Sequence, residues 1–202
     1  MTQALIHLVD DDEAVRRSLA LLVGSLGLRT AQWADPASFL AGFDRAAVGA
    51  IVLDIRLPGQ SGLALLEQLQ AEGVDQPVVM LTGHATVALC RRAFKSGAHE
   101  FLEKPVDEDR LIDALHEAVR RHVASRQRLA ADRAAQARLA RLSDREREVM
   151  ARVVRGETAK QVGRALGLSP RTVETHRAHA AEKLKATSLA QLIRQYGAAL
   201  DP

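Results

Sequence analysis

The sequence predicts an α/β domain joined by a helical linker to a smaller all-α domain. Short apolar runs alternate with amphipathic stretches over residues 1–120, the composition shifts to Ala, Arg and Gln over residues 121–141, and helical patterns alone fill residues 142–202. Alternating strands and helices are typical of a parallel sheet with helices on both faces. In such sheets, functional side chains gather outside the carboxyl ends of the strands.

The first region contains five strand-like runs, each followed by a helical stretch. The strand-like runs are Leu5–Val9, Leu28–Trp33, Ala50–Leu53, Val78–Leu81 and Glu100–Leu102. The helical stretches are Val15–Leu26, Ser38–Gly42, Leu63–Ala71, Thr86–Ser96 and the segment from Asp107 onward. In the last stretch Leu111, Leu115 and Val119 recur every four residues, which places them on one face of a helix. We therefore expect a five-stranded parallel sheet over residues 1–120.

Residues 121–141 are predicted to be a linker. This segment contains no Gly or Pro, and six arginines stand against the single acid Asp132. The six are Arg121, Arg126, Arg128, Arg133, Arg138 and Arg141. The composition favours a helix that continues the last helix of the first domain, and a disordered basic tether is the alternative.

Residues 142–202 are predicted to form four helices. Capping and turn residues mark the helix boundaries at Ser143 with Glu146, Gly156, Gly167, and Ser169 with Pro170. A serine followed three residues later by a glutamate is a capping box, and proline favours the first turn of a helix. The fourth helix, Ser188–Tyr196, carries an apolar stripe of Leu189, Leu192 and Ile193 that suits pairing with a second copy.

Composition excludes several classes of protein. The single cysteine, Cys90, excludes an internal disulfide framework and a cysteine-based metal cluster. No stretch approaches the ~20 apolar residues of a membrane span. The first residues, Met1 to His7, lack the basic region and apolar run of a signal peptide. We expect a cytoplasmic protein with no membrane partner.

The charge is distributed unevenly along the chain. Residues 1–120 carry 11 Lys and Arg against 17 Asp and Glu, whereas residues 121–202 carry 17 against 8. The net charge of +3 therefore hides an acidic first region and a basic second one. Such asymmetry points to a polyanion as partner of the basic region, and a solvated basic surface is the alternative.

Polar side chains collect at the predicted carboxyl edge of the sheet. Asp10 and Asp11 follow the first strand, Asp54 ends the third, Thr82 ends the fourth, and Lys104 follows the fifth. Three clustered carboxylates repel one another unless a cation neutralises them, and a hard divalent ion such as Mg²⁺ prefers oxygen ligands. A carboxylate nucleophile, a metal, a lysine and a hydroxyl are the groups that phosphoryl transfer requires.

Four segments resemble the signature of two-component receiver domains, in order and at the usual spacing over residues 5–120. They are Val9–Asp11, Leu53–Gly59, Leu81–His84 and Glu103–Pro105. The resemblance implies a flavodoxin-like sheet of strand order 2-1-3-4-5. It also implies that Asp54 accepts the phosphoryl group and that Thr82 and Phe101 form a switch pair.

The same resemblance implies a set of ligands around Asp54. Mg²⁺ or Mn²⁺ would be bound by Asp11 directly, by Asp10 largely through water, and by the backbone carbonyl of Arg56. Lys104 would contact the phosphoryl oxygens, and its bond to Pro105 would be cis.

The four C-terminal helices have the arrangement of a helix-turn-helix DNA reader. Val173, Ala180 and Leu184 give the third helix an inward stripe. The outward or edge residues predicted to contact DNA are Lys160, Arg171, Thr172, Glu174, Thr175, His176, Arg177 and Lys183. Within this set we expect Arg171, Glu174 and Arg177 to reach base edges, and Lys160, Thr172, His176 and Lys183 to contact phosphates.

This segment resembles the LuxR-type effector domain. The resemblance rests on Leu142–Val149 at its opening, on Leu168–Arg177 around the third helix, and on Lys183-Leu184 at its close. Together with the receiver motifs, it makes the chain similar to the FixJ-like branch of response regulators. The sequence departs from the LuxR-type pattern at Ala159, Gly163 and His179. These departures bear on phosphate contacts and on sequence preference.

The sequence therefore predicts a DNA-binding transcriptional response regulator, activated when a sensor histidine kinase phosphorylates Asp54. We expect it to dimerise on phosphorylation and to bind duplex promoter DNA. The alternative is a signalling adaptor whose C-terminal bundle binds protein. A phosphatase or hydrolase is not favoured, because the acidic site serves self-phosphorylation, with at most weak autodephosphorylation, and no second catalytic set is present.

Overall fold

A computed structural model describes residues 4–200 of the chain. The chain divides into two compact units between Arg126 and Gln127, a boundary that falls inside the segment 121–141. Within residues 4–200, no helix is long and apolar enough to cross a membrane.

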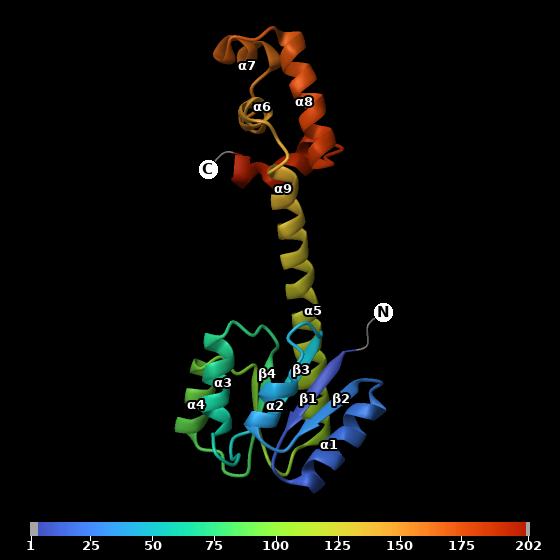
Figure 1. Ribbon diagram of the computed structural model, residues 1–202, viewed down its shortest axis with the longest axis vertical. Helices are drawn as coiled ribbons and strands as arrows, with labels where there is room; N and C mark the ends of the chain where they lie inside the picture. The colour runs from blue at the N-terminus through green and yellow to red at the C-terminus, as the bar shows by residue number, and fades with distance from the viewer. Residues whose placement is uncertain (1–3, 201–202) are drawn as a thin grey trace. The chain divides into compact units, whose positions relative to one another are not determined.

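The first unit is built on a five-stranded parallel sheet (Figure 1). Its strands are β1 (Leu5–Val9), β2 (Arg29–Trp33), β3 (Gly49–Asp54), β4 (Val78–Thr82) and β5 (Glu100–Glu103). They lie in the order β2-β1-β3-β4-β5, which confirms the predicted order. In this register Val9 pairs with Leu53 and Asp54 with Leu81, so the carboxyl ends of β1, β3 and β4 lie at one edge.

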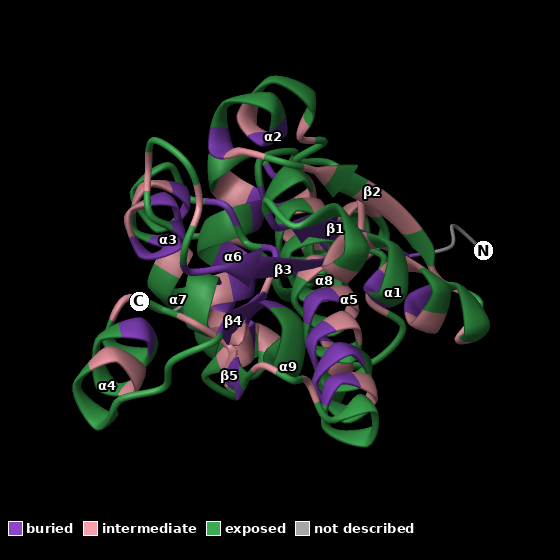
Figure 2. Cartoon of the chain, turned by 90° about the horizontal axis from the view of Figure 1, so that it is seen from below, coloured by how far each residue is buried: buried purple, intermediate pink, exposed green. Residues whose placement is uncertain are grey.

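Helices cover both faces of this sheet. They are α1 (Glu13–Ser25), α2 (Pro36–Gly42), α3 (Gly62–Ala71), α4 (Val87–Lys95) and the first part of α5 (Glu108–Leu139). Ile51 and Leu53 of β3 face a core shared with α2, α3 and α4, whereas Ala50 and Val52 face a core shared with α1 and α5. The central strands are therefore apolar on both sides and fully buried (Figure 2).

Polar caps set where the helices of the first unit begin. Asp12 accepts hydrogen bonds from the backbone N–H groups of Ala14 and Val15, so it caps α1 rather than joining the acidic cluster. Side chains cap the next three helices in the same way, at Asp35, Ser61 and Thr86.

The linker is helical. Helix α5 continues for 32 residues to Leu139, so the alternative of a disordered tether is wrong. Residues 127–133 are exposed all round, and Leu139 enters the core of the second unit. A helical stretch that is exposed on every side is a solvated connection between the two units.

The second unit is a four-helix arrangement. Its helices are α6 (Asp144–Val154), α7 (Ala159–Leu166), α8 (Pro170–Leu184) and α9 (Leu189–Leu200). The predicted inward stripe of α8 is confirmed, since Val173, Ala180 and Leu184 are all fully buried. The capping box of Ser143 and Glu146 is also present.

Helix α9 differs from the predicted apolar stripe. Leu192 is only 3% exposed and packs into the core with Tyr196, so it is not available to a second copy. Leu189 and Ile193 are each 44% exposed. Burial in the bundle takes Leu192 out of the stripe, because helix α9 must turn one apolar face toward α6 and α8.

Candidate functional sites at the sheet edge and on the helix-turn-helix

The carboxyl edge of the sheet brings Asp10, Asp54, Thr82 and Lys104 together. Asp10 follows β1, Asp54 and Thr82 are the last residues of their strands, and Lys104 follows β5. The Nζ atom of Lys104 lies 2.6 Å from Asp10 Oδ2 and 2.6 Å from Asp54 Oδ1. Both carboxylates are almost fully buried, at 2% and 4% exposure. One lysine therefore bridges two buried acids that are 44 positions apart in sequence.

Backbone groups orient the two acids. The N–H of Arg56 donates to Asp54 Oδ2 at 2.6 Å, and the N–H of Asp12 donates to Asp10 Oδ1 at 3.0 Å. The guanidinium of Arg16 donates to the carbonyl of Asp10 at 2.6 Å. Arg16 has no motif around it that would have revealed this role from sequence.

Burial and the contacts between Asp54 and Lys104 have opposite effects on the pKa values of these two residues. Burial raises the pKa of Asp54, the charge of Asp10 adds to this effect, and the hydrogen bond from Lys104 opposes it. Burial disfavours the charged form of Lys104, but hydrogen bonds to Asp10 and Asp54 raise its pKa above the ordinary value. The ammonium ion is thus held in place by the carboxylates, and a second cation at this site would favour the charged form of Asp54.

The donor set fits a hard divalent cation only in part. Two buried carboxylates offer oxygen atoms, whereas Asp11 is exposed beside them. Among residues 4–200, no group of three or more His, Cys, Asp or Glu side chains is placed to hold a metal ion. The structure thus brings Asp10 and Asp54 together but not Asp11, and Arg56, which is exposed, touches the site through its N–H.

The proposed switch residues lie on neighbouring strands. Thr82 is buried, and its Oγ1 accepts from the N–H of His84 at 3.2 Å and donates to the carbonyl of His84 at 3.3 Å. Phe101 is 8% exposed and pairs in register with Met80, two residues before Thr82. The bond between Lys104 and Pro105 is cis, as the resemblance implied.

The helix-turn-helix presents most of the predicted DNA contacts to solvent. Gly167 ends α7 in the left-handed conformation, and Ser169 caps α8. The exposed members of the predicted set are Lys160, Arg171, Glu174, Thr175 and Arg177. Thr172 and His176 are half-buried, and Thr172 also bonds the Oγ of Ser169 at 2.8 Å.

Lys183 has a structural partner that the sequence did not indicate. Its Nζ lies 2.6 Å and 2.8 Å from the two carboxylate oxygens of Glu146, which is only 4% exposed. The hydrogen bond from Lys183 lowers the pKa of Glu146. Lys183 therefore ties α8 to α6 and would have to exchange this ion pair to contact a phosphate.

A parallel sheet with this acid–lysine cluster, followed by a helix-turn-helix bundle, defines a response regulator with a DNA-binding output domain. Residues 6–116 match the family described as response regulator receiver domain, and residues 140–196 match bacterial regulatory proteins, luxR family. The chain belongs to the response regulators that combine these two domains, and it is a DNA-binding transcriptional regulator.

Several transcriptional regulatory proteins are similar to this chain over nearly its whole length. The sequence is 44% identical over 192 residues to the transcriptional regulatory protein FixJ of Azorhizobium caulinodans, covering 94% of this chain and 90% of that protein. It is 42% identical over 191 residues to the C4-dicarboxylate transport transcriptional regulatory protein DctR of Rhodobacter capsulatus, covering 94% and 97%.

Solved structures of response regulators are similar as well. The response regulator StyR superposes with a TM-score of 0.90 at 34% identity, covering 98% of this chain and 100% of that one. Full-length FixJ from B. japonicum gives a TM-score of 0.61 at 37% identity, covering 98% of each chain. The predicted FixJ-like combination of a receiver with a LuxR-type domain is thereby confirmed.

Proposed function

We propose that Asp54 accepts a phosphoryl group from a sensor histidine kinase and that this phosphorylation controls DNA binding. The observation that carries the proposal is the contact of Lys104 Nζ with both Asp54 Oδ1 and Asp10 Oδ2, each at 2.6 Å. A lysine held between two buried acids is placed to bind the carboxylate of Asp54 before the transfer and the oxygens of the phosphoryl group after it.

The transfer requires one bond to form and one to break. A carboxylate oxygen of Asp54 attacks phosphorus, the P–N bond to the kinase histidine breaks, and its electron pair stays with the imidazole. Mg²⁺ or Mn²⁺, when bound, supplies positive charge that offsets the phosphoryl oxygens. Asp10, Asp11 and the backbone carbonyl of Arg56 are the groups we assign to hold it, and Asp11 would have to turn inward.

The proposed reactions modify only Asp54 of the protein itself. Lys104 and Thr82 would bind the phosphoryl oxygens, and slow attack of water on the acyl phosphate would return Asp54 to its carboxylate. We propose self-phosphorylation with weak autodephosphorylation and no turnover of an external substrate. To reach the phosphoryl group, Thr82 Oγ1 must give up its two bonds to the backbone of His84.

Phosphorylation would be read out through the face formed by α4 and β5. Val87 and Phe94 of α4 are 87% and 46% exposed, so this face carries apolar surface that a second copy could cover. We propose that reorientation of Thr82 and Phe101 changes this face and promotes a homodimer. Leu189 and Ile193 of α9 would add contacts between the two DNA-binding domains.

In the DNA complex we place α8 in the major groove. Arg171, Glu174 and Arg177 are spaced by about one helical turn on its exposed side and are assigned to base edges. Lys160, Thr172 and His176 are assigned to phosphates, with Thr175 beside them, and Lys183 only if it leaves Glu146. Two-fold symmetry requires inverted half-sites about one helical turn apart.

Labelling by a small acyl-phosphate donor tests the phosphorylation site. The wild-type chain should incorporate about one phosphoryl group only when Mg²⁺ is present, and Asp54→Asn should incorporate none. Asp113→Asn, at an exposed position of α5, is the matched control and should label like the wild type. Undiminished labelling of Asp54→Asn would refute the assignment.

A further inference from the structure

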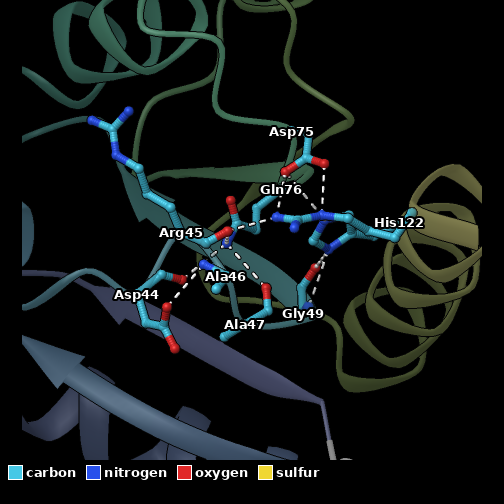
Figure 3. A network of polar contacts seen from close by, with 9 residues as sticks. Asp44, Arg45, Ala46, Ala47, Gly49, Asp75, Gln76 and His122 are labelled. Carbon is cyan, nitrogen blue, oxygen red and sulfur yellow. Dashed lines mark hydrogen bonds and ion pairs between the residues drawn. The ribbon is translucent and has the colours of Figure 1, made fainter. Parts of the chain in front are cut away.

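A second polar cluster surrounds Gly49, the first residue of β3, at the end of the strand opposite to Asp54. Figure 3 shows this cluster. It joins the side chains of Asp75, His122 and Arg126 to backbone groups of Arg45 and Gly49, and we name these five residues the clasp. No receiver motif includes its side chains.

His122 is the buried centre of the clasp. Its side chain is fully buried, and its Nδ1 lies 2.9 Å from the carbonyl oxygen and 3.1 Å from the nitrogen of Gly49. Its Nε2 accepts a hydrogen bond from Arg126 Nε at 3.1 Å. Nε2 also lies 3.4 Å from Asp75 Oδ1, so each ring nitrogen faces both a donor and an acceptor, and the imidazole is bonded on both sides in either tautomer.

Arg126 connects the imidazole to two loops. Its guanidinium forms a two-point ion pair with Asp75, at 2.7 Å to Oδ2 and 2.8 Å to Oδ1, and donates to the carbonyl of Arg45 at 2.5 Å. The side chains of Arg126 and Asp75 are about one-third exposed. A single exposed pair contributes little, but a two-point arginine–carboxylate pair with further bonds has a defined geometry.

The loops that receive Arg126 are themselves held in place. The amide of Gln76, which is 2% exposed, donates to the carbonyls of Asp44 and Ala47 at 3.1 Å each. Arg45 pairs with Glu72 across the same loops. The clasp therefore binds α5 to the segments that lead into β3 and β4.

These are the strands whose other ends carry the switch groups. β3 runs from Gly49 in the clasp to Asp54, and β4 begins three residues after Asp75 and ends at Thr82. β3 packs closely against β1 at Gly49, because a Cβ there would lie 1.7 Å from the carbonyl oxygen of Leu5, so no side chain fits at this position. We therefore expect a displacement of Gly49 to be transmitted along β3 to Asp54.

The clasp is also where the first unit ends. Arg126 is its last residue, and the helix is exposed from Gln127 to Arg133. The last side chains that hold α5 to the first unit are thus those of the clasp. They add polar contacts to the apolar ones that Leu111, Leu115 and Ala118 of the same helix make with the receiver core.

We propose that Asp75, His122 and Arg126 are positioning residues for the output: the clasp couples the receiver to the linker helix, and breaking it uncouples DNA binding from phosphorylation. This rests on the proposed function, since it presupposes that phosphorylation changes DNA affinity. The clasp itself takes no part in phosphoryl transfer, because it lies at the far ends of the strands.

Variants of Arg126 and Asp75, whose side chains are about one-third exposed, test the proposal. Arg126→Gln and Asp75→Asn should label with a small acyl phosphate as fast and as completely as the wild type. The ratio of DNA affinities with and without phosphorylation, expected to be roughly 5- to 150-fold in the wild type, should fall toward one. Amide hydrogen exchange at residues 120–130 should become faster in both variants.

Two further variants distinguish loss of coupling between phosphorylation and DNA binding from simple destabilisation of the receiver. Arg128→Gln removes the same charge from the same helix at an exposed position and should leave the affinity ratio unchanged. The charge-swapped double variant Asp75→Arg with Arg126→Asp can re-form the ion pair and should recover part of the ratio. Thermal melting of the receiver identifies a variant that is merely unfolded.

The outcomes distinguish the two proposals. A wild-type affinity ratio of one would overturn phosphorylation-controlled DNA binding and the coupling with it. A large wild-type ratio that persists in Arg126→Gln and Asp75→Asn would overturn the clasp alone. A ratio that falls equally in Arg128→Gln would show that charge on the linker, and not the clasp, is responsible.

Discussion

Lys104 Nζ and Asp54 Oδ1 lie 2.6 Å apart at the carboxyl edge of the sheet. The positive charge of Lys104 favours the charged form of Asp54, whereas burial disfavours it. Burial nevertheless prevails, since the pKa of Asp54 is raised. The cost of keeping a charged acceptor at this position has a measurable consequence for stability.

Asp54→Asn should make the protein more stable near pH 7. The folded state holds the Asp54 proton more tightly than the unfolded chain does, so the negative charge lowers stability above the ordinary carboxyl pKa. An amide removes that charge and its repulsion with Asp10. Urea unfolding should show a higher midpoint for Asp54→Asn than for the wild type. The control Asp113→Asn should not change the midpoint, and a lower midpoint for Asp54→Asn would contradict the argument.

His7 should make stability depend on pH in the acidic range. Burial lowers the pKa of His7 from 6.5 to about 4, while the charge of Asp44 opposes the shift. The unfolded chain therefore binds a proton that the folded chain refuses between these pH values. The contribution of the neutral His7 to the free energy of unfolding is fully present above about pH 6.5. It is lost as the pH falls toward 4, by up to about 3 kcal/mol.

The variant His7→Gln tests this dependence. Glutamine keeps an acceptor for Trp33 Nε1, which donates to His7 Nδ1 at 3.1 Å, but cannot be protonated in this range. Unfolding free energies measured between pH 4 and 7 should show a shallower slope for His7→Gln. The exposed His116→Gln serves as control and should keep the wild-type slope.

Gly163→Ala should destabilise the DNA-binding domain although alanine favours helices. A Cβ at Gly163 would lie 2.6 Å from the carbonyl oxygen of Leu168, so the turn before α8 would have to move. Such overpacking typically costs about 1–3 kcal/mol, more than the roughly 1 kcal/mol gained from helix propensity. Gly197→Ala in α9 meets only Ile193 Cγ2 at 3.6 Å and should instead be stabilising. Thermal melts of the two variants should shift in opposite directions.

Arg171 and Lys160 should affect DNA binding in different ways. Arg171→Ala should cost about 1–3 kcal/mol on the preferred sequence and relax the preference, as expected for a base contact. Lys160→Ala should weaken all sequences alike and reduce the slope of log affinity against log salt by about one. Titrations of specific and random duplexes at several salt concentrations separate these effects. Equal losses on both duplexes for Arg171→Ala would place it on the phosphates.

Arg177 should bind DNA better once its intrahelical partner is removed. Its guanidinium lies 3.4 Å from Glu174 Oε1, and both side chains are about half exposed. Glu174→Gln would free the guanidinium and remove a negative charge from the groove-facing side of α8. We expect tighter binding to random duplexes and a smaller difference between specific and random DNA. Unchanged affinity for both duplexes would mean that neither residue faces the groove.

The sequence by itself determined the two-domain organisation, the strand order and the family. Alternating apolar runs and amphipathic stretches favour a parallel sheet whose strands have their carboxyl ends at one edge, and the resemblance to receiver domains implied the strand order. The capping box of Ser143 and Glu146 and the N-cap at Ser169 likewise depend on local spacing alone. Asp10, Asp54, Thr82 and Lys104 were predictable because each stands directly at a strand end.

Only the tertiary structure decided how side chains far apart in the sequence pair. Lys183 bonds Glu146 across 37 residues, Arg126 bonds Asp75 across 51, and Leu192 turns into the core. A pattern along the chain gives the face of a helix but not which neighbour meets that face. Burial then fixes the outcome, because a buried charge or imidazole must find a partner wherever packing has placed one.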